Sequence, residues 1–123
     1  MTNIKDYNIP YNSNYIFDNS AYSEHGEHII KQIKEIEEPP SALLITSDQV
    51  AVGLVVYCQI QQITIPDELA IVAFGNHYLT EMLNITTLTI QLEQMGNNLF
   101  LQAISKEASH QEATVELIER GTA

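Results

Sequence analysis

The stretch ALLITSDQVAVGLVVYCQIQQITIPDELAIVAFGN, residues 42–76, decides the fold of this chain. Apolar runs without alternation fill 42–46 and 69–74, which is typical of strands buried on both faces of a parallel sheet. Residues 48–62 between them are rich in β-branched side chains, but they exceed the length of an ordinary internal strand. Length therefore outweighs propensity and predicts a helix there. The stretch predicts two parallel strands joined by a right-handed helical crossover.

The rest of the chain continues this alternation. Upstream, 15–17 predicts a short strand, and 23–38 predicts an amphipathic helix that Pro39 and Pro40 end. Downstream, we expect a helical turn at 78–83, extended chain at 86–90, an amphipathic helix over 92–106 and a strand at 113–118. Alternating strands and helices indicate the α/β class, an open and mostly parallel sheet flanked by helices. The length of 123 residues predicts a single domain, 1–123.

Composition excludes some functions. Five Lys and Arg against sixteen Asp and Glu give a net charge of −11, so we expect no direct nucleic-acid contact by this chain. The acidity itself favours solubility. No apolar run approaches the roughly 20 residues that cross a bilayer, and the first residues do not form a signal peptide pattern. A single cysteine, Cys58, excludes an internal disulfide and fits a reducing compartment, so we expect a cytoplasmic protein.

Polar and small residues follow both strands of the central unit. In open α/β sheets, ligands bind beyond the carboxyl ends of the strands, which selects Ser47 and Asp48 after one strand and Gly75 and Asn76 after the next. Ser47 and Asp48 offer a hydroxyl and a carboxylate to a polar ligand such as a sugar. Helix capping alone explains the same pair, because both residue types are preferred at a helix start. Gly75 is equally explained by a backbone turn.

Catalytic and metal-binding patterns are weak. His25 and His28 stand at i, i+3, but a zinc site needs about four ligands and no cysteine is near. Cys58 lies in the middle of an apolar helix, where a thiol is inert. The sequence has neither a glycine-rich phosphate loop nor a G-x-S-x-G elbow. We therefore predict no metal, no cofactor and no enzymatic activity.

The helix predicted at 48–62 is apolar nearly all round, whereas a helix on a small sheet needs one buried stripe. Its apolar residues are Val50, Val52, Leu54, Val55, Val56, Tyr57, Cys58 and Ile60. Either a second layer of this chain or a second subunit covers the remainder. In so short a chain we favour a subunit, which predicts a homodimer.

Five segments occur in a familiar order: YNIPYNSNYIFDNSAYSEHGEHIIKQI (7–33), PSALLITSDQVAVGL (40–54), ITIPDELAIVAFGN (63–76), ITTLTIQLEQMG (85–96) and VELIERGT (115–122). Together they resemble the sensor domain of LacI-type bacterial transcription regulators, including members similar to maltose-operon repressors. Such regulators carry a helix-turn-helix headpiece followed by a two-lobed sensor like the periplasmic binding proteins. The resemblance implies that this chain holds the C-terminal lobe without a DNA-binding headpiece. It also implies that the helix 92–106 crosses to the other lobe.

The resemblance also implies an effector site, whose positions carry uncommon residues here. The family's ligand-stacking aromatic matches Ala21, with Tyr22 beside it, and its sugar-binding Asn matches Ser47. Its sugar-binding Asp matches Gly75, with Asn76 as the nearest polar group, and its Gln matches Ile90. The family's dimer contacts match Val52, Val55, Val56, Met82 and Leu83.

Two functions follow as expectations. The first is the effector-binding and dimerisation part of a LacI-type regulator that senses a sugar or related small molecule. The second is a truncated, stand-alone dimerisation module that has lost effector binding, which the four uncommon positions motivate. A lobe of a transport or receptor protein is a weaker alternative, because no signal peptide pattern is present.

Overall fold

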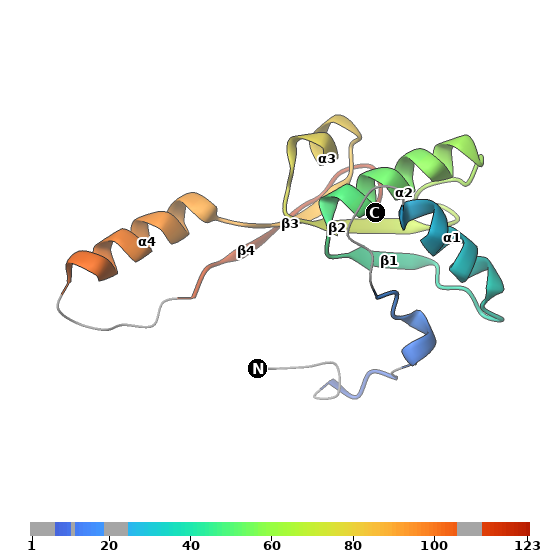
Figure 1. The fold of residues 1–123 in the computed structure, drawn as a ribbon, viewed down its shortest axis with the longest axis horizontal. Helices are drawn as coiled ribbons and strands as arrows, with labels where there is room; N and C mark the ends of the chain where they lie inside the picture. The colour runs from blue at the N-terminus through green and yellow to red at the C-terminus, as the bar shows by residue number, and fades with distance from the viewer. Residues whose placement is uncertain (1–6, 11, 19–24, 106–111) are drawn as a thin grey trace.

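The computed structural model describes residues 7–10, 12–18, 25–105 and 112–123 (Figure 1). The elements in chain order are the 3-10 helix η2 (Ser13–Tyr15), α1 (His25–Glu35), β1 (Ala42–Ile45), α2 (Asp48–Ile60), β2 (Ala70–Phe74), α3 (Tyr78–Met82), β3 (Thr86–Ile90), α4 (Leu92–Ile104) and β4 (Val115–Ile118). The predicted α/β class with an open, mostly parallel sheet is confirmed. Within the described residues, no helix is both long and apolar enough to pass through a membrane.

The sheet has the strand order β1-β2-β3-β4. β1 and β2 are parallel, with Ala42 opposite Ala70, and β2 and β3 are parallel, with Val72 opposite Thr86. β4 runs antiparallel to β3, with Leu88 opposite Leu117. The strand–helix–strand unit predicted from 42–76 is therefore β1–α2–β2, and its two strands are neighbours in the sheet.

The core lies between the sheet and the helices α1 and α2. Helix α1 packs against α2, and α2 packs against β1 and β2. The packing is tight at Gly26 of α1, because a Cβ there would collide with the backbone of Gly53 and Leu54 in α2. Fully buried side chains include Leu54, Ile71 and Ile85. A second layer of this same chain, α1, thus covers part of the apolar circumference of α2.

The C-terminal turn closes the sheet between β2 and β3. Thr122 is 5% exposed, and its hydroxyl accepts a hydrogen bond from the Thr86 N–H (2.8 Å) and donates one to the Ile71 carbonyl (2.7 Å). The Ile71 N–H in turn donates to the Thr122 carbonyl (2.7 Å). Thr122 therefore supplies hydrogen bonds at the amino ends of two strands, before their direct pairing begins.

Two predictions about strands need correction. The segment 15–17 is no strand: Tyr15 ends the 3-10 helix, Ile16 is extended, and neither Ile16 nor Phe17 pairs with the described sheet. The strand β1 is not buried on both faces either. Leu44 is 65% exposed while Ile45 is buried, because β1 forms the edge of the described sheet and has helices on one face.

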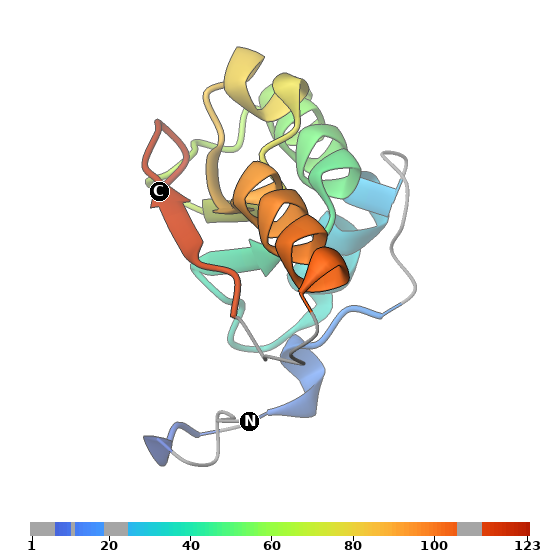
Figure 2. The same ribbon diagram turned by 90° about the vertical axis from the view of Figure 1, so that its left-hand side faces the viewer.

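Helix α4 stands apart from the other helices. It lies at the end of an arm made by β3 and β4, far from the body in Figure 1, and faces the viewer in Figure 2. None of its residues is buried. Its exposed apolar side chains are Leu92, Met95, Leu99, Phe100, Leu101 and Ile104. The amphipathic pattern predicted a helix correctly, but its apolar side contacts no layer within the described residues.

Candidate functional site

The carboxyl edge of the three parallel strands gathers most of the predicted site residues. Ser47 and Asp48 follow β1, Gly75 and Asn76 follow β2, and Ile90 ends β3. The Gly75 N–H donates to the Leu88 carbonyl (2.8 Å), so the turn after β2 is fixed against β3. Ile90 lies two residues further, at the base of the arm. Parallel neighbouring strands end on the same edge, which is why residues 43 positions apart in sequence lie along one edge of the sheet. The predicted positions Ala21 and Tyr22 lie outside the described residues.

Asp48 binds the neighbouring turn of its own chain. Its Oδ2 accepts a hydrogen bond from the His77 N–H (2.8 Å), and its Oδ1 is buried without a hydrogen-bond partner among the described residues. A Cβ built on Gly75 would lie 2.5 Å from the same Oδ2. The carboxylate therefore connects the start of α2 to the turn between β2 and α3. This structural role leaves one oxygen, Oδ1, without a partner.

Ser47 occupies the N-cap position of α2, as its alternative interpretation predicted, with an extended backbone (φ −127°, ψ 119°). Its hydroxyl makes no capping hydrogen bond, so capping does not account for the side chain. The backbone carbonyl of Ser47 accepts from the Ala51 N–H (3.0 Å), which starts the helix. Ser47 thus brings a half-buried hydroxyl to the strand edge that the cap does not use.

Asn76 is held by an arginine that sequence reasoning did not select. Arg120 donates from Nη2 to the Asn76 Oδ1 (3.0 Å) and from Nη1 to the Ile85 carbonyl (2.8 Å). Asn76 has φ +59°, a left-handed conformation that asparagine tolerates better than most residues. Arg120 belongs to VELIERGT, one of the segments on which the family resemblance rests. The sequence did not show that this arginine would bond a residue 44 positions away.

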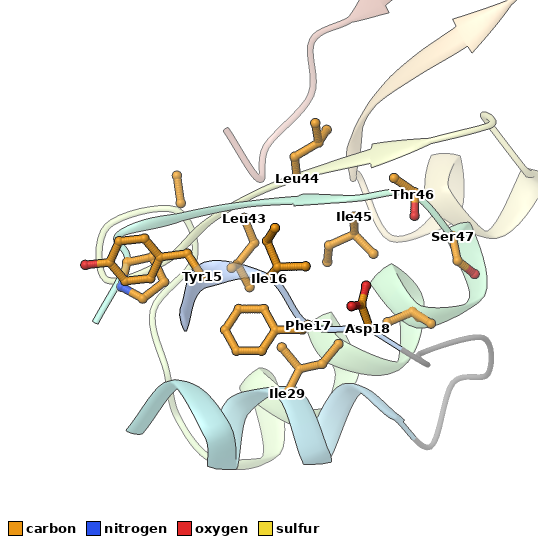
Figure 3. Close-up of a pocket in the computed structure, with 13 residues that line it drawn as sticks. Tyr15, Ile16, Phe17, Asp18, Ile29, Leu43, Leu44, Ile45, Thr46 and Ser47 are labelled. Atoms are coloured by element: carbon orange, nitrogen blue, oxygen red, sulfur yellow. The ribbon is translucent and has the colours of Figure 1, made fainter. Parts of the chain in front are cut away.

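A pocket of about 470 Å³ reaches only part of this edge (Figure 3). It runs along β1 and ends at Thr46 and Ser47, but Gly75, Asn76 and Ile90 do not line it. Asp18 faces it from the segment after η2, near Ser47. The predicted site residues after β2 and β3 therefore form an open edge, while the hollow lies on the other side of β1.

The other titratable groups that the sequence selected are Cys58, His25 and His28. Cys58 is buried in α2, and that burial raises the pKa of its thiol, in agreement with the predicted inert cysteine. Among the described residues, no three His, Cys, Asp or Glu side chains are grouped as metal ligands. His25 and His28 both lie in α1, and the His28 side chain belongs to no such group.

Of the predicted dimer residues, Val52, Val55 and Val56 lie on α2. Met82 and Leu83 lie at the end of α3. Val56 and Met82 are exposed (39% and 74%), and Val52 and Leu83 are half-buried. Val55 differs, because it is 3% exposed and packs in the core of its own chain. A helix apolar all round does not reveal which side chains its own subunit covers, so sequence alone did not separate Val55 from Val56.

The whole chain matches one family of domains. Residues 2–123 fit the family described as periplasmic binding protein-like domain. The chain belongs to this family. Two curated relatives from Bacillus subtilis (strain 168) support the assignment. The uncharacterized HTH-type transcriptional regulator YkvZ is 30% identical over 90 residues, which are 73% of this chain and 28% of YkvZ. The NTD biosynthesis operon regulator NtdR is 29% identical over 103 residues, 82% of this chain and 31% of NtdR.

Solved structures of transcription regulators share the fold of this chain. A LacI regulator from Bacillus cereus subsp. cytotoxis NVH 391-98 has a TM-score of 0.80 at 21% identity, covering 98% of this chain and 45% of the other. The transcription regulator CcpA of Lactococcus lactis has a TM-score of 0.78 at 20% identity, covering 97% and 46%. The predicted likeness to LacI-type regulators is confirmed. The chain spans about a third of its curated relatives and under half of these structures.

The relatives also bear on catalysis. They are transcriptional regulators rather than enzymes, which agrees with the prediction of a non-enzymatic chain. The described fold belongs to the ligand-binding domain of such regulators, and the strand edge with Ser47 and Asn76 is where open α/β sheets bind ligands.

Proposed function

We propose that this chain is the C-terminal part of the effector-binding domain of a LacI-type transcription regulator, and that it binds a small polar effector and forms a homodimer. The observation that carries the proposal is the edge where β1, β2 and β3 end, in a chain of the periplasmic binding protein-like family. Ligands bind at such edges in open α/β sheets. A regulator of bacterial genes acts in the cytoplasm, so the proposal includes that location.

The effector we propose is a sugar or a related hydroxyl-rich molecule. The Ser47 hydroxyl makes no capping bond, and the Asn76 amide oxygen accepts from Arg120 while its NH₂ group makes no hydrogen bond within the described residues. One hydroxyl and one amide donor suit sugar hydroxyls. A LacI family regulator from Lactobacillus casei, with a TM-score of 0.76 at 17% identity, has been solved with bound glucose and with bound sucrose. Ala21, Tyr22, Gly75 and Ile90 complete the proposed contacts, and Asp48 is expected to position the turn.

Residues 1–123 form, in this proposal, one lobe of a two-lobed sensor, and α4 belongs partly to the other lobe. Support comes from the exposed apolar side of α4, which packs against nothing in the described residues. Apolar surface of this extent calls for a partner. The solved relatives are about twice as long as the chain, so they contain such a second part.

In the complete regulator, effector binding between the lobes would change the populations of two dimer states, one competent for operator DNA and one not. The DNA contact belongs to a headpiece outside residues 1–123, because a chain with a net charge of −11 is a poor partner for phosphates. Upstream coding sequence in the same frame is the direct check. If that upstream sequence encodes no helix-turn-helix, the proposed regulator function is wrong for this gene product.

Calorimetric titration tests the effector site. We expect saturable heat with at least one member of a panel of neutral sugars that includes glucose and sucrose. Ser47→Ala should weaken that binding about three- to tenfold, the effect of one hydrogen bond. Ser41→Ala is the matched control, because Ser41 lies at the opposite end of β1 and should leave the affinity unchanged.

The alternative is a dimerisation module that no longer binds an effector. Gly75 and Ile90 favour it, because neither offers a polar side chain at an edge where a sugar needs hydrogen-bond partners. Absence of heat across the whole panel, together with a dimer in sedimentation, would establish this alternative over the first proposal.

A further inference from the structure

Arg120 bridges the two ends of the connection that carries α3. Its Nη2 donates to the Asn76 Oδ1 (3.0 Å) shortly before α3, and its Nη1 donates to the Ile85 carbonyl (2.8 Å) shortly after it. The backbone N–H of Arg120 donates to the Thr86 hydroxyl (2.9 Å), which fixes the base of the side chain at the start of β3. Because a guanidinium is planar and rigid, this one side chain sets where the Asn76 amide lies relative to β3.

The contact decides which end of the Asn76 amide stays free. A guanidinium only donates hydrogen bonds, so the amide oxygen and not the nitrogen must face Arg120. Oxygen and nitrogen lie on opposite branches of a planar amide, so the NH₂ group is directed away from the guanidinium. That NH₂ group makes no hydrogen bond within the described residues. Asn76 is half-buried at the end of β2, and it offers donors there while its acceptor already faces Arg120.

Other groups hold the backbone of the same turn. The Gly75 N–H donates to a carbonyl of β3 (2.8 Å), and the His77 N–H donates to the Asp48 carboxylate (2.8 Å). Arg120 takes part in neither bond. Asp48 and β3 thus hold the main chain of the turn, whereas Arg120 holds the side chain of Asn76. Loss of the guanidinium should therefore free the amide to rotate without removing the turn.

No carboxylate competes with Asn76 for this guanidinium in the described part of the chain. Arg120 forms no ion pair there, although the whole chain carries sixteen Asp and Glu. Its bond to the amide oxygen has a charged donor, and such bonds are roughly twice as strong as bonds between neutral groups. The orientation of the Asn76 amide is therefore well defined by Arg120 alone.

We propose that Arg120 is a positioning residue of the effector site, which holds the Asn76 oxygen and thereby presents the Asn76 NH₂ group to an oxygen atom of the effector. This inference rests on the proposed effector site at the strand edge. It adds a rule of selectivity to that site, because an NH₂ group of an amide donates and does not accept. At this point the site binds a ligand atom with lone pairs, so a sugar hydroxyl is recognised through its oxygen and not through its proton.

Replacement of a sugar hydroxyl by fluorine separates the two modes of recognition, because fluorine keeps lone pairs but has no proton to donate. The probes are glucose and sucrose, with the monodeoxy and monodeoxyfluoro analogues of their glucose ring, titrated calorimetrically into the complete chain. At the hydroxyl that meets Asn76, the fluoro analogue should bind about three- to tenfold more tightly than the deoxy analogue. At a hydroxyl that donates to the protein, both analogues should lose affinity equally.

Two variants assign that preference to the contact between Arg120 and Asn76. Asn76→Asp keeps an oxygen for the guanidinium but carries no NH₂ group, so the preference for the fluoro analogue should disappear while the fold persists. Arg120→Met frees the amide to turn its oxygen outward, so the ratio of the two affinities should fall toward one. Nitrogen relaxation of the Asn76 NH₂ group should show an ordered side chain in the unaltered chain and a mobile one in Arg120→Met.

Lys34→Met is the matched control, because it removes the same charge from an exposed position of α1 and should leave the ratio unchanged. A merely structural role of Arg120 would lower the affinity for all analogues alike and would also leave the ratio unchanged. Asn76→Asp carries the test if Arg120→Met fails to fold.

Three results would overturn the inference. The first is an unchanged preference for the fluoro analogue in Asn76→Asp or Arg120→Met. The second is an equal loss for both analogues at every hydroxyl in the unaltered chain. The third is the absence of binding by both glucose and sucrose, in which case the rest of the sugar panel decides the proposed function separately.

Discussion

The carboxylate of Asp48 occupies the position that a side chain at residue 75 would need. Oδ2 of Asp48 is 2.5 Å from the place where a Cβ on Gly75 would lie, and the same oxygen accepts the His77 N–H at 2.8 Å. Gly75 also has φ +130°, which residues with a side chain rarely adopt. The contact between the start of α2 and the turn after β2 therefore requires glycine at this position.

Gly75→Ala is consequently expected to destabilise the fold. The new methyl group would displace the Asp48 carboxylate from His77 and force a strained backbone, with a cost of about 1–3 kcal/mol. Urea unfolding followed by circular dichroism measures this cost. Gly96→Ala is the matched control, because a Cβ on Gly96 in α4 meets nothing within 4 Å. It should leave stability unchanged or raise it by up to about 1 kcal/mol. Equal effects at both glycines would contradict the role assigned to Asp48.

Thr122→Val tests the closure of the sheet by the C-terminal turn. Valine keeps the shape of threonine but leaves the buried Thr86 N–H and Ile71 carbonyl without their partner. We expect a loss of about 1–3 kcal/mol in the free energy of unfolding. Thr122→Ser retains the hydroxyl and should recover most of that loss. Thr89→Val is the control, because its hydroxyl makes only a long local bond to the Ile90 carbonyl (3.4 Å), and an effect within about 0.5 kcal/mol is expected.

Glu68 gives the fold a pH dependence of known sign. Its carboxylate accepts hydrogen bonds from the hydroxyl and the backbone N–H of Thr64, and these bonds hold the pKa of Glu68 below its usual range. A lowered folded-state pKa stabilises the fold fully above the usual glutamate pKa. That contribution is lost as pH falls through the lowered value.

An NMR titration of the Glu68 side chain is the measurement. Thr64→Ala removes the hydroxyl, which is the larger cause, and should raise the pKa of Glu68 toward its usual range. Because the backbone N–H of Thr64 persists, we expect part of the lowering to remain. A Glu68 pKa that does not move in Thr64→Ala would show that the hydroxyl bond is absent in solution.

The strand–helix–strand unit was predictable because its signals are local. Apolar runs and a segment too long for a strand predict β1, α2 and β2 without knowledge of distant contacts. The segment 15–17 has the same apolar character but is no strand, because a strand also needs a neighbour to pair with and β propensity alone does not supply one. The edge position of β1, and thus the exposure of Leu44, depends on that same missing pairing.

The position of Ser47 and Asn76 at the strand edge was predictable, but their contacts were not. The rule that ligands bind at strand ends selected Ser47 and Asn76, and the structure places both at that edge. The bond from Arg120 to Asn76 joins residues 44 positions apart, and no periodicity predicts such a pair. The sequence left capping by Ser47 or Asp48 open as an alternative, whereas the structure gives Ser47 no capping bond and Asp48 a bond to His77.

The last prediction concerns the interface of the proposed dimer. Val56 on α2 and Met82 on α3 are exposed apolar side chains on two helices that are in contact with each other. Val56→Glu would place a charge inside an interface formed there, and burying an unpaired carboxylate is costly. We expect sedimentation velocity to show a dimer for the unaltered chain and a monomer for Val56→Glu. Val55→Glu is unsuitable, because Val55 is buried in its own subunit and the charge would unfold the core.

Gln59→Glu is the control for the added charge. Gln59 is an exposed polar residue of the same helix, so its replacement changes the net charge by the same amount without removing apolar contact area. It should remain dimeric, with circular dichroism unchanged in both variants. A dimer that persists in Val56→Glu would move the interface away from α2 and α3. The exposed side of α4 would then be the next surface to substitute, because its apolar residues also lack a partner in the described chain.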